Sequence, residues 1–302
     1  MCESCGCSEG AKVTLTNLRT GATAEIVGDH RHAHDHDHHH HDHADHDHSH
    51  GHNHSDHDHH HHHADDHGHS HDHAHEHTHG HVVELGQAIL QKNNELAARN
   101  RAWFAGREIL ALNLVSSPGA GKTTLLERTI REQGGTHGFY VIEGDQATVK
   151  DGERIQAAGA PAVQVNTGTG CHLEADMIAR ALKELAPAFR SVVMIENVGN
   201  LVCPALFDLG ERAKVAIISV TEGEDKALKY PHMFQASRLV LINKIDLLPH
   251  LQFDIGQCIE NIRAVNPDAE ILQLSATNGE GMDAWYAWIA AQSTSARNEA
   301  VL

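Results

Sequence analysis

Residues Ser116 to Thr124 read S-S-P-G-A-G-K-T-T, and these residue types at this spacing suit a nucleotide polyphosphate. They follow the apolar run Ile109 to Val115 and precede the helix-forming run Leu125 to Glu132, so we expect a loop between a strand and a helix. The glycines let backbone amides approach phosphate oxygens, the lysine brings positive charge to the β- and γ-phosphates, and the first threonine suits Mg²⁺. Ser116 stands where the pattern G-x-x-x-x-G-K-[ST] has its first glycine, so the entry turn departs from the pattern. The residues expected to contact nucleotide here are Gly119, Ala120, Gly121, Lys122, Thr123 and Thr124.

A second loop has the composition needed to read a nucleotide base. Asn243-Lys244-Ile245-Asp246 follows the apolar run Leu239 to Ile242, and the carboxyl ends of parallel strands build ligand sites. The Asp246 carboxylate can accept hydrogen bonds from the ring N–H and the exocyclic amine of guanine, a pair that adenine does not offer. We expect Asn243 and Lys244 to brace the loop and cover the ring, with Ser275 and Ala276 following a later strand nearby.

Two acidic residues at predicted strand ends are candidates for holding Mg²⁺ and positioning water. Asp145 lies in E-G-D-Q, and Glu196 lies in E-N-V-G. A cation that bridges the β- and γ-phosphates requires carboxylates near Thr123, either directly or through water. Together with Lys122 and Thr123, these two carboxylates form the expected catalytic set.

Thiols and an imidazole next to these loops suggest a transition-metal site. Cys171 and His172 directly precede a predicted helix, and Cys203 follows the Glu196 segment. Nickel and zinc both take such ligands. Three ligands are an incomplete shell, so a second protomer, water or shared thiolates should complete it. Cys258 is expected to be a core residue.

The amino-terminal region offers further metal ligands. Cys2, Cys5 and Cys7 form C-x-x-C-x-C, which with the terminal amine suits nickel or zinc. Of the 32 histidines, 28 lie between His30 and His81, interspersed with aspartates. This tract has no periodic apolar face, so we expect it to be disordered without metal and to bind nickel, copper or zinc with little selectivity.

Charge and hydropathy exclude several classes of function. The formal net charge is −18, of which residues 30–81 carry −10 and the remainder −8, and no basic stripe exists for nucleic acid. The sequence contains no apolar run of about 18 residues, so we expect no membrane span. The amino terminus lacks the basic and apolar regions of a signal peptide. These features indicate a reducing, cytoplasmic setting in which cysteines are metal-linked or buried.

From residue 109 onward, apolar runs alternate with helical patterns, which predicts a three-layer α/β fold with a mostly parallel sheet. We divide the chain into a Cys-containing segment 1–29, a His-rich tract 30–81, a nucleotide-binding domain 82–292 with a helical lead-in, and a polar tail 293–302. Residues 8–29 are compatible with a loose strand pair or with disorder. The predicted strands are 109–115, 139–143, 162–166, 191–196, 214–220, 238–243 and 270–274, and the predicted helices are 122–134, 151–158, 173–186, 224–236, 254–265 and 282–291.

Taken together, these motifs resemble the HypB family of hydrogenase nickel-insertion GTPases, densely over residues 109–291. The resemblance implies a P-loop GTPase fold of the nucleotide-dimerised, metal-and-signal-recognition group. It implies GTP hydrolysis to GDP coupled to nickel delivery into [NiFe]-hydrogenase large-subunit precursors, with a HypA-type metallochaperone as partner and a nucleotide-dependent homodimer. By the same resemblance, Cys171, His172 and Cys203 match the family's dimer-interface metal site, and Cys2, Cys5 and Cys7 match a tighter nickel site found in some members. The alternatives are a urease accessory GTPase and a nickel or zinc storage protein with a vestigial GTPase domain.

Overall fold

The computed structural model describes residues 13–26, 77–145 and 150–299, and within helix α1 (His77–Ala105) it describes the side chains only from residue 87 onward. Cys2, Cys5, Cys7 and residues 30–76 of the His-rich tract therefore lie outside the described residues. Within the described part of the chain, no helix is long and apolar enough to cross a membrane.

The described residues form one nine-stranded sheet in the order β2-β1-β5-β4-β6-β3-β7-β8-β9. Strands β3 to β9 pair in parallel, whereas β1 pairs antiparallel with both β2 and β5. The predicted strands are all present, and the segment whose order the sequence left open forms the hairpin β1–β2 on the sheet edge. The strands are β1 (Val13–Asn17), β2 (Thr23–Ile26), β3 (Leu110–Ser116), β4 (Phe139–Asp145), β5 (Ala162–Asn166), β6 (Val192–Glu196), β7 (Ala213–Ser219), β8 (Leu239–Asn243) and β9 (Glu270–Gln273).

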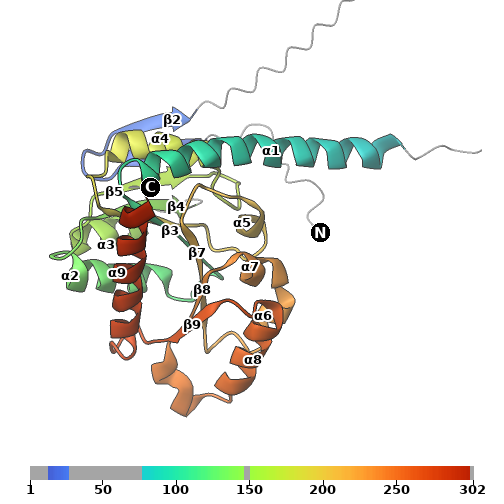
Figure 1. The fold of residues 1–302 in the computed structure, drawn as a ribbon, viewed down its shortest axis with the longest axis vertical. Coiled ribbons are helices and arrows are strands. Elements are labelled where there is room, and N and C mark those ends of the chain that lie inside the picture. Colours follow the sequence, from blue (N-terminus) through green and yellow to red (C-terminus); the bar gives the residue numbers. More distant parts are fainter. Residues whose placement is uncertain (1–12, 27–76, 146–149, 300–302) are drawn as a thin grey trace, which may run out of the picture.

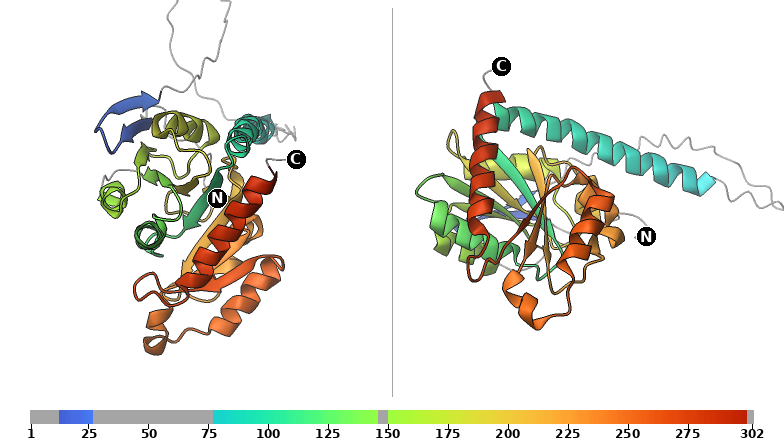
Figure 2. Two further views of the ribbon diagram at one scale, coloured as in Figure 1. Left: turned by 60° about the vertical axis from the view of Figure 1, so that its left-hand side comes forward. Right: turned by 60° about the horizontal axis from the view of Figure 1, so that its bottom comes forward.

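Helices cover both faces of this sheet and give three layers (Figure 1). Helices α2, α3 and α9 pack on one face, and α1, α4 and α6 to α8 pack on the other. Helix α1 runs along one end of the molecule and projects beyond it (Figure 2). The remaining helices are α2 (Lys122–Gln133), α3 (Lys150–Ala158), α4 (Ala175–Leu185), α5 (Cys203–Leu206), α6 (Lys226–Lys229), α7 (Pro231–Ala236), the 3-10 helix η1 (Ile245–His250), α8 (Ile255–Val265) and α9 (Met282–Glu299).

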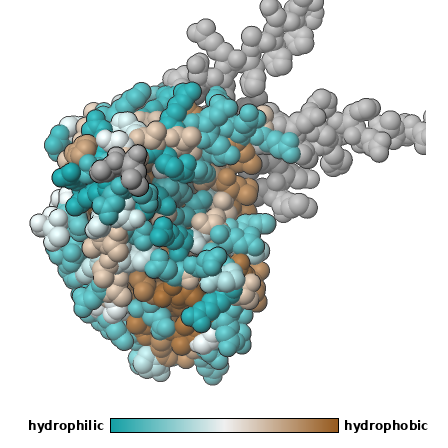
Figure 3. Space-filling view, in the orientation of Figure 1, coloured by the Kyte–Doolittle hydropathy of each residue, from teal (hydrophilic) through white to brown (hydrophobic). Residues whose placement is uncertain are grey.

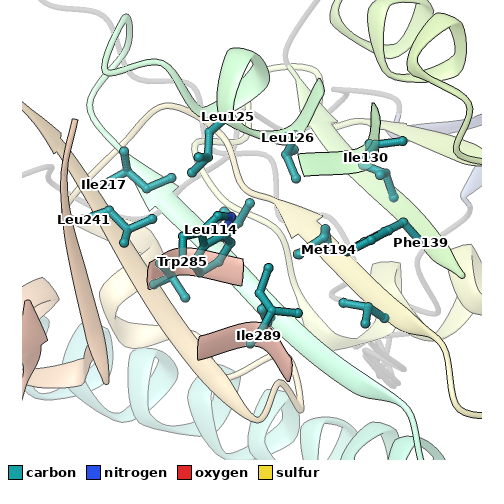
Figure 4. Packing of buried hydrophobic residues seen from close by; sticks show 14 of the residues in the cluster. Leu114, Leu125, Leu126, Ile130, Phe139, Met194, Ile217, Leu241, Trp285 and Ile289 are labelled. Atoms are coloured by element: carbon teal, nitrogen blue, oxygen red, sulfur yellow. The ribbon is translucent and has the colours of Figure 1, made fainter. Parts of the chain in front are cut away.

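Alternate residues of β3 serve different layers, because successive side chains of a strand point to opposite faces. Leu114 packs with Leu125 of α2 and with Trp285 and Ile289 of α9 (Figure 4). The Trp285 indole N–H also donates to Thr129 Oγ1 over 3.0 Å, which satisfies the one polar atom of that ring inside the core. The core thus anchors the strand that leads into the phosphate-binding loop.

The surface seen in Figure 3 is mostly hydrophilic, with hydrophobic residues gathered at the level of β8 and β9. Strand β9 is the last strand of the sheet, and its residues Ile271 and Leu272 are only half-buried. An edge strand has no neighbour to cover its outer side, so this exposure follows from the topology.

Two helical predictions need correction. The expected polar tail 293–302 is helical as far as Glu299, because Ser293 and Ala296 are buried and Arg212 holds the Glu299 carboxylate at 2.6 Å. The single helix predicted over 224–236 is two helices, α6 and α7, separated at Tyr230. Pro231 has no backbone N–H to continue α6, and it starts α7 instead.

Candidate functional site

The phosphate-binding loop joins β3 to α2, as the sequence predicts, and lines a cavity of about 570 Å³. Ser116, which replaces the expected glycine, is the last residue of β3 and needs no left-handed backbone. Its hydroxyl accepts a hydrogen bond from Lys122 Nζ at 2.8 Å. Burial lowers the pKa of Lys122, while the nearby Glu196 opposes that shift. Ser116, the residue that departs from the P-loop pattern, therefore holds Lys122 inside the cavity.

The base-reading loop is bonded directly to the phosphate-binding loop. Asn243 Nδ2 donates to the Ala120 carbonyl at 2.9 Å, and Lys244 Nζ donates to the Gly119 carbonyl at 2.7 Å. Asn243 Oδ1 accepts from the backbone N–H of Ala276 at 3.1 Å. One asparagine thus holds together three segments that the sequence places more than 30 residues apart.

This contact explains the glycine at position 121. Gly121 has φ +101°, and a Cβ built there would lie 2.5 Å from Asn243 Nδ2. A side chain would strain the backbone and also break the contact between the two loops. The nucleotide cavity therefore depends on Gly121 for two separate reasons.

Asp246 lies in η1, directly after this contact. Its Oδ1 is buried and has no hydrogen-bond partner among the described residues. A buried carboxylate oxygen without a partner is costly, so a ligand that donates hydrogen bonds would remove the cost. The arrangement fits a base with adjacent N–H donors.

The expected Mg²⁺ residues meet at the same cavity. Thr123 Oγ1 donates to Glu196 Oε1 at 2.8 Å, and Asp145 lines the cavity with them. Burial raises the pKa of Glu196, while Lys122 and the Thr123 hydroxyl lower it. A hydroxyl and carboxylates converging in this way form an oxygen-rich donor set, which fits Mg²⁺.

Three charged residues of the cavity were not identified from the sequence: Glu143, Asp151 and Arg154. Glu143 sits on β4 opposite Glu196 of β6, and burial with that neighbouring carboxylate raises the pKa of Glu143 to about 9. Arg154 contacts Asp151 at 3.0 Å and is thereby held at the cavity wall. Glu143 belongs to the E-G-D-Q motif, but its proximity to Glu196 depends on β4 and β6 being neighbours, which the sequence does not show.

The candidate metal ligands come together from two loops. Cys171 Sγ lies 2.8 Å from Cys203 Sγ and 3.7 Å from His172 Nδ1, and one ligand atom from each of the three residues lies within 4.8 Å of the others. Cys171 and His172 precede α4, whereas Cys203 begins α5. Two thiols and an imidazole at these distances match the ligands of nickel or zinc sites.

The environment of His172 leaves one ring nitrogen available. The ring is buried and stacks on Phe207 with a centroid distance of 3.8 Å, and in the described part of the chain its Nε2 has no hydrogen-bond partner. Glu174 Oε1 is 3.6 Å from that nitrogen, which is beyond hydrogen-bond distance. Stacking therefore fixes the ring while Nε2 remains available to bind a metal ion.

Cys171 also lines the nucleotide cavity. Gly144, between Glu143 and Asp145, has no side chain, and a Cβ there would lie 2.9 Å from Leu173. The absence of a side chain lets the segment after His172 pack closely on β4. The metal ligands and the nucleotide residues thus share one wall.

Known proteins are similar to this chain in sequence and in fold. Residues 110–273 match the family model described as CobW/HypB/UreG, nucleotide-binding domain. The hydrogenase maturation factor HypB of Escherichia coli (strain K12) is 59% identical over 211 residues, covering 70% of this chain and 73% of that protein. The crystal structure of HypB from Archaeoglobus fulgidus matches with a TM-score of 0.64 at 35% identity, covering 67% of this chain and 99% of that one. The structure of HypB from Helicobacter pylori in complex with nickel matches with a TM-score of 0.64 at 36% identity, covering 68% of this chain and 96% of that one.

Proposed function

Because the chain belongs to the HypB family of hydrogenase maturation factors, we propose that it hydrolyses GTP to GDP and phosphate and couples this reaction to nickel delivery. The recipient is the precursor of a [NiFe]-hydrogenase large subunit, and a HypA-type metallochaperone is the partner in transfer. The observation that carries the proposal is that Cys171, one of three clustered metal ligands, lines the cavity of the nucleotide residues.

The base-reading loop and the residues of the cavity have separate roles in GTP hydrolysis. Asp246 selects guanine, and Lys122 with the loop amides holds the phosphates. Thr123 and Glu196 would hold Mg²⁺, directly or through water, and bound Mg²⁺ neutralises charge that develops on the β- and γ-phosphates. Asp145 shares that role or orients the attacking water. Catalysis of this kind depends on positioning the reactants and on electrostatic stabilisation of the transition state, rather than on covalent chemistry by the protein.

Nickel is the cargo of the Cys171, His172 and Cys203 ligand set, which also accepts zinc by its chemistry. One protomer supplies three ligands, so a second copy of the chain would complete the shell across a two-fold axis. GTP favours the closed homodimer in this scheme, and hydrolysis opens it and releases nickel. The nucleotide shifts the equilibrium between the closed and the open homodimer, and with it nickel binding, only if it binds these two states with different affinity.

The amino-terminal segment binds additional nickel in this scheme. Cys2, Cys5 and Cys7 form a second, tighter nickel site, and residues 30–81 store or buffer the ion. These roles rest on ligand chemistry alone, because thiolates and imidazoles at this density bind nickel and zinc.

Nickel affinity in two nucleotide states tests the coupling. We expect the full-length protein to bind nickel with different affinity in GDP and in a non-hydrolysable GTP analogue, and Cys171→Ala to remove that difference. Cys258→Ala is the matched control, because Cys258 is a buried thiol away from the ligand set. Equal affinities in both nucleotide states would contradict the proposal.

Hydrogenase activity in cells lacking the endogenous protein separates delivery from storage. We expect Cys171→Ala to abolish hydrogenase activity, and deletion of residues 30–81 to affect it only when nickel is scarce. A purified protein without GTP hydrolysis would instead support a storage protein with a vestigial GTPase domain.

A further inference from the structure

The geometry points to Lys214 as a positioning residue for the metal site: its ammonium group holds the short helix that carries Cys203 and, through Glu211, ties that helix to the loop that carries His172. This inference rests on the proposed metal site and adds a residue that lies on β7, outside both metal-binding loops.

Lys214 binds the backbone at the end of α5. Its Nζ donates to the carbonyls of Pro204 at 2.8 Å, Phe207 at 3.1 Å and Ala205 at 3.5 Å. Helix α5 has only four residues, so its carbonyls lack intrahelical partners. An ammonium group offers three donors and no acceptor. Lys214 therefore donates hydrogen bonds to the otherwise unsatisfied carbonyls of the residues that follow Cys203.

The lysine is buried and its charge is matched by one carboxylate. Lys214 and Glu211 are each 7% exposed, and Lys214 Nζ lies 3.8 Å from Glu211 Oε1. Burial lowers the pKa of Lys214, and Glu211 opposes this shift. A charge in such a place is stable only when it is paired and hydrogen-bonded.

Glu211 continues the network toward the second metal-binding loop. Its Oε1 accepts from Asn113 Nδ2 at 3.0 Å, and Asn113 Oδ1 accepts from Asn197 Nδ2 at 3.2 Å. Asn197 Oδ1 in turn accepts from the backbone N–H of Leu173 at 3.3 Å. The side chains of Asn113 and Asn197 are almost completely buried, so water does not compete for these bonds.

The two ends of this network sit beside the metal ligands. Leu173 directly follows His172, and the carbonyl of Pro204 directly follows Cys203. Asn197 also directly follows Glu196, which bonds to Thr123 at the nucleotide cavity. The network therefore spans from one metal-binding loop to the other and passes the nucleotide site on the way.

Cobalt spectroscopy of the full-length protein separates positioning from simple stabilisation. Co²⁺ is the probe, because thiolate-to-cobalt absorption reports whether the cysteines are ligands. Each protein and the same protein carrying Cys171→Ala are titrated with Co²⁺. The difference between the two titrations removes the absorption from the amino-terminal cysteines and histidines and leaves the Cys171-dependent binding. We expect Lys214→Met to weaken the Cys171-dependent binding by about 10-fold or more, with GDP binding unchanged within about twofold.

Two further variants keep the test decisive. Lys214→Met with Glu211→Gln removes the ammonium without leaving a buried carboxylate unpaired, so it should fold even where the single variant does not. We expect the same loss of Cys171-dependent binding in this double variant. Lys229→Met is the control, because that lysine is exposed and pairs with Asp225 on the surface.

The outcomes are distinguishable. Unchanged Cys171-dependent absorption and affinity in folded Lys214→Met and in the double variant would overturn the inference and leave the metal site intact. Lower thermal stability with unchanged cobalt affinity would likewise assign Lys214 a purely structural role. A wild-type spectrum identical to that of Cys171→Ala would overturn the proposed metal site and the inference together.

Discussion

Replacing Asp246 by Asn tests the base-reading role with a single atom exchanged. Asp246 Oδ1 is buried, and none of the residues that the structure describes donates a hydrogen bond to it, which leaves this oxygen available to guanine. The amide keeps the size of the side chain but replaces one acceptor with a donor. Guanine presents two donors at this edge, so one of them would face an N–H group.

The expected magnitude follows from the hydrogen bonds lost. A hydrogen bond to a charged group contributes about 1.5–3 kcal/mol, and two such bonds to the carboxylate are altered. A net loss of about 3 kcal/mol weakens GDP binding by about 150-fold. Xanthine has a carbonyl where guanine has its amine, so the amide of Asp246→Asn pairs with it and xanthosine diphosphate should bind more tightly than before.

Competition against a fluorescent nucleotide measures the effect, with GDP, xanthosine diphosphate and ADP as competitors. Asp268→Asn serves as the control, because Asp268 is an exposed residue outside the cavity. A preference for GDP over xanthosine diphosphate that is the same in wild type and Asp246→Asn would refute the assignment.

Three further changes have defined outcomes. Gly121→Ala should weaken GDP binding by more than about 10-fold in a titration, since its Cβ would lie 2.5 Å from Asn243 Nδ2, whereas Gly135→Ala, with open space around it, should not. Burial raises the pKa of Cys258 to about 11 from 9.0, so iodoacetamide at pH 8 should label it about 100-fold more slowly in the native than in the unfolded chain. Because the folded thiol keeps its proton to higher pH, this group's contribution to stability is complete below pH 9 and is lost as pH rises toward 11; equal labelling rates would contradict this environment. Asn100→Ala should lower the free energy of unfolding by about 1–3 kcal/mol in a urea titration, because its buried amide donates two hydrogen bonds that join α1 to the first residue of α4 and to the loop at Leu209; a smaller change would show that water replaces them.

The amino-acid sequence was sufficient for the fold class and for the order of its elements. Alternating apolar runs and helical patterns predicted all seven parallel strands, because these patterns are local. One error arose where Pro231 divides a predicted helix, and another where a tertiary contact extends one. Helix α9 continues past the predicted end because Arg212, more than 80 residues earlier, binds Glu299.

The sequence by itself determined which candidate functional residues the chain has, since residue types at fixed spacing define the predicted phosphate-binding loop, the N-K-I-D loop and the candidate metal ligands. Only the tertiary structure decided which of these residues meet. Strand β3 lies between β6 and β7, which brings Glu196 to Thr123, and the loop before α4 meets the start of α5, which brings Cys171 to Cys203. The physical reason is that element type is set by nearby residues, whereas the neighbours of an element are set by burial of apolar faces across the whole domain. Lys214 illustrates the difference. From the sequence it is only a charged residue in a predicted strand, whereas the structure shows it buried and bonded to a carbonyl of α5, which links it to the proposed metal site.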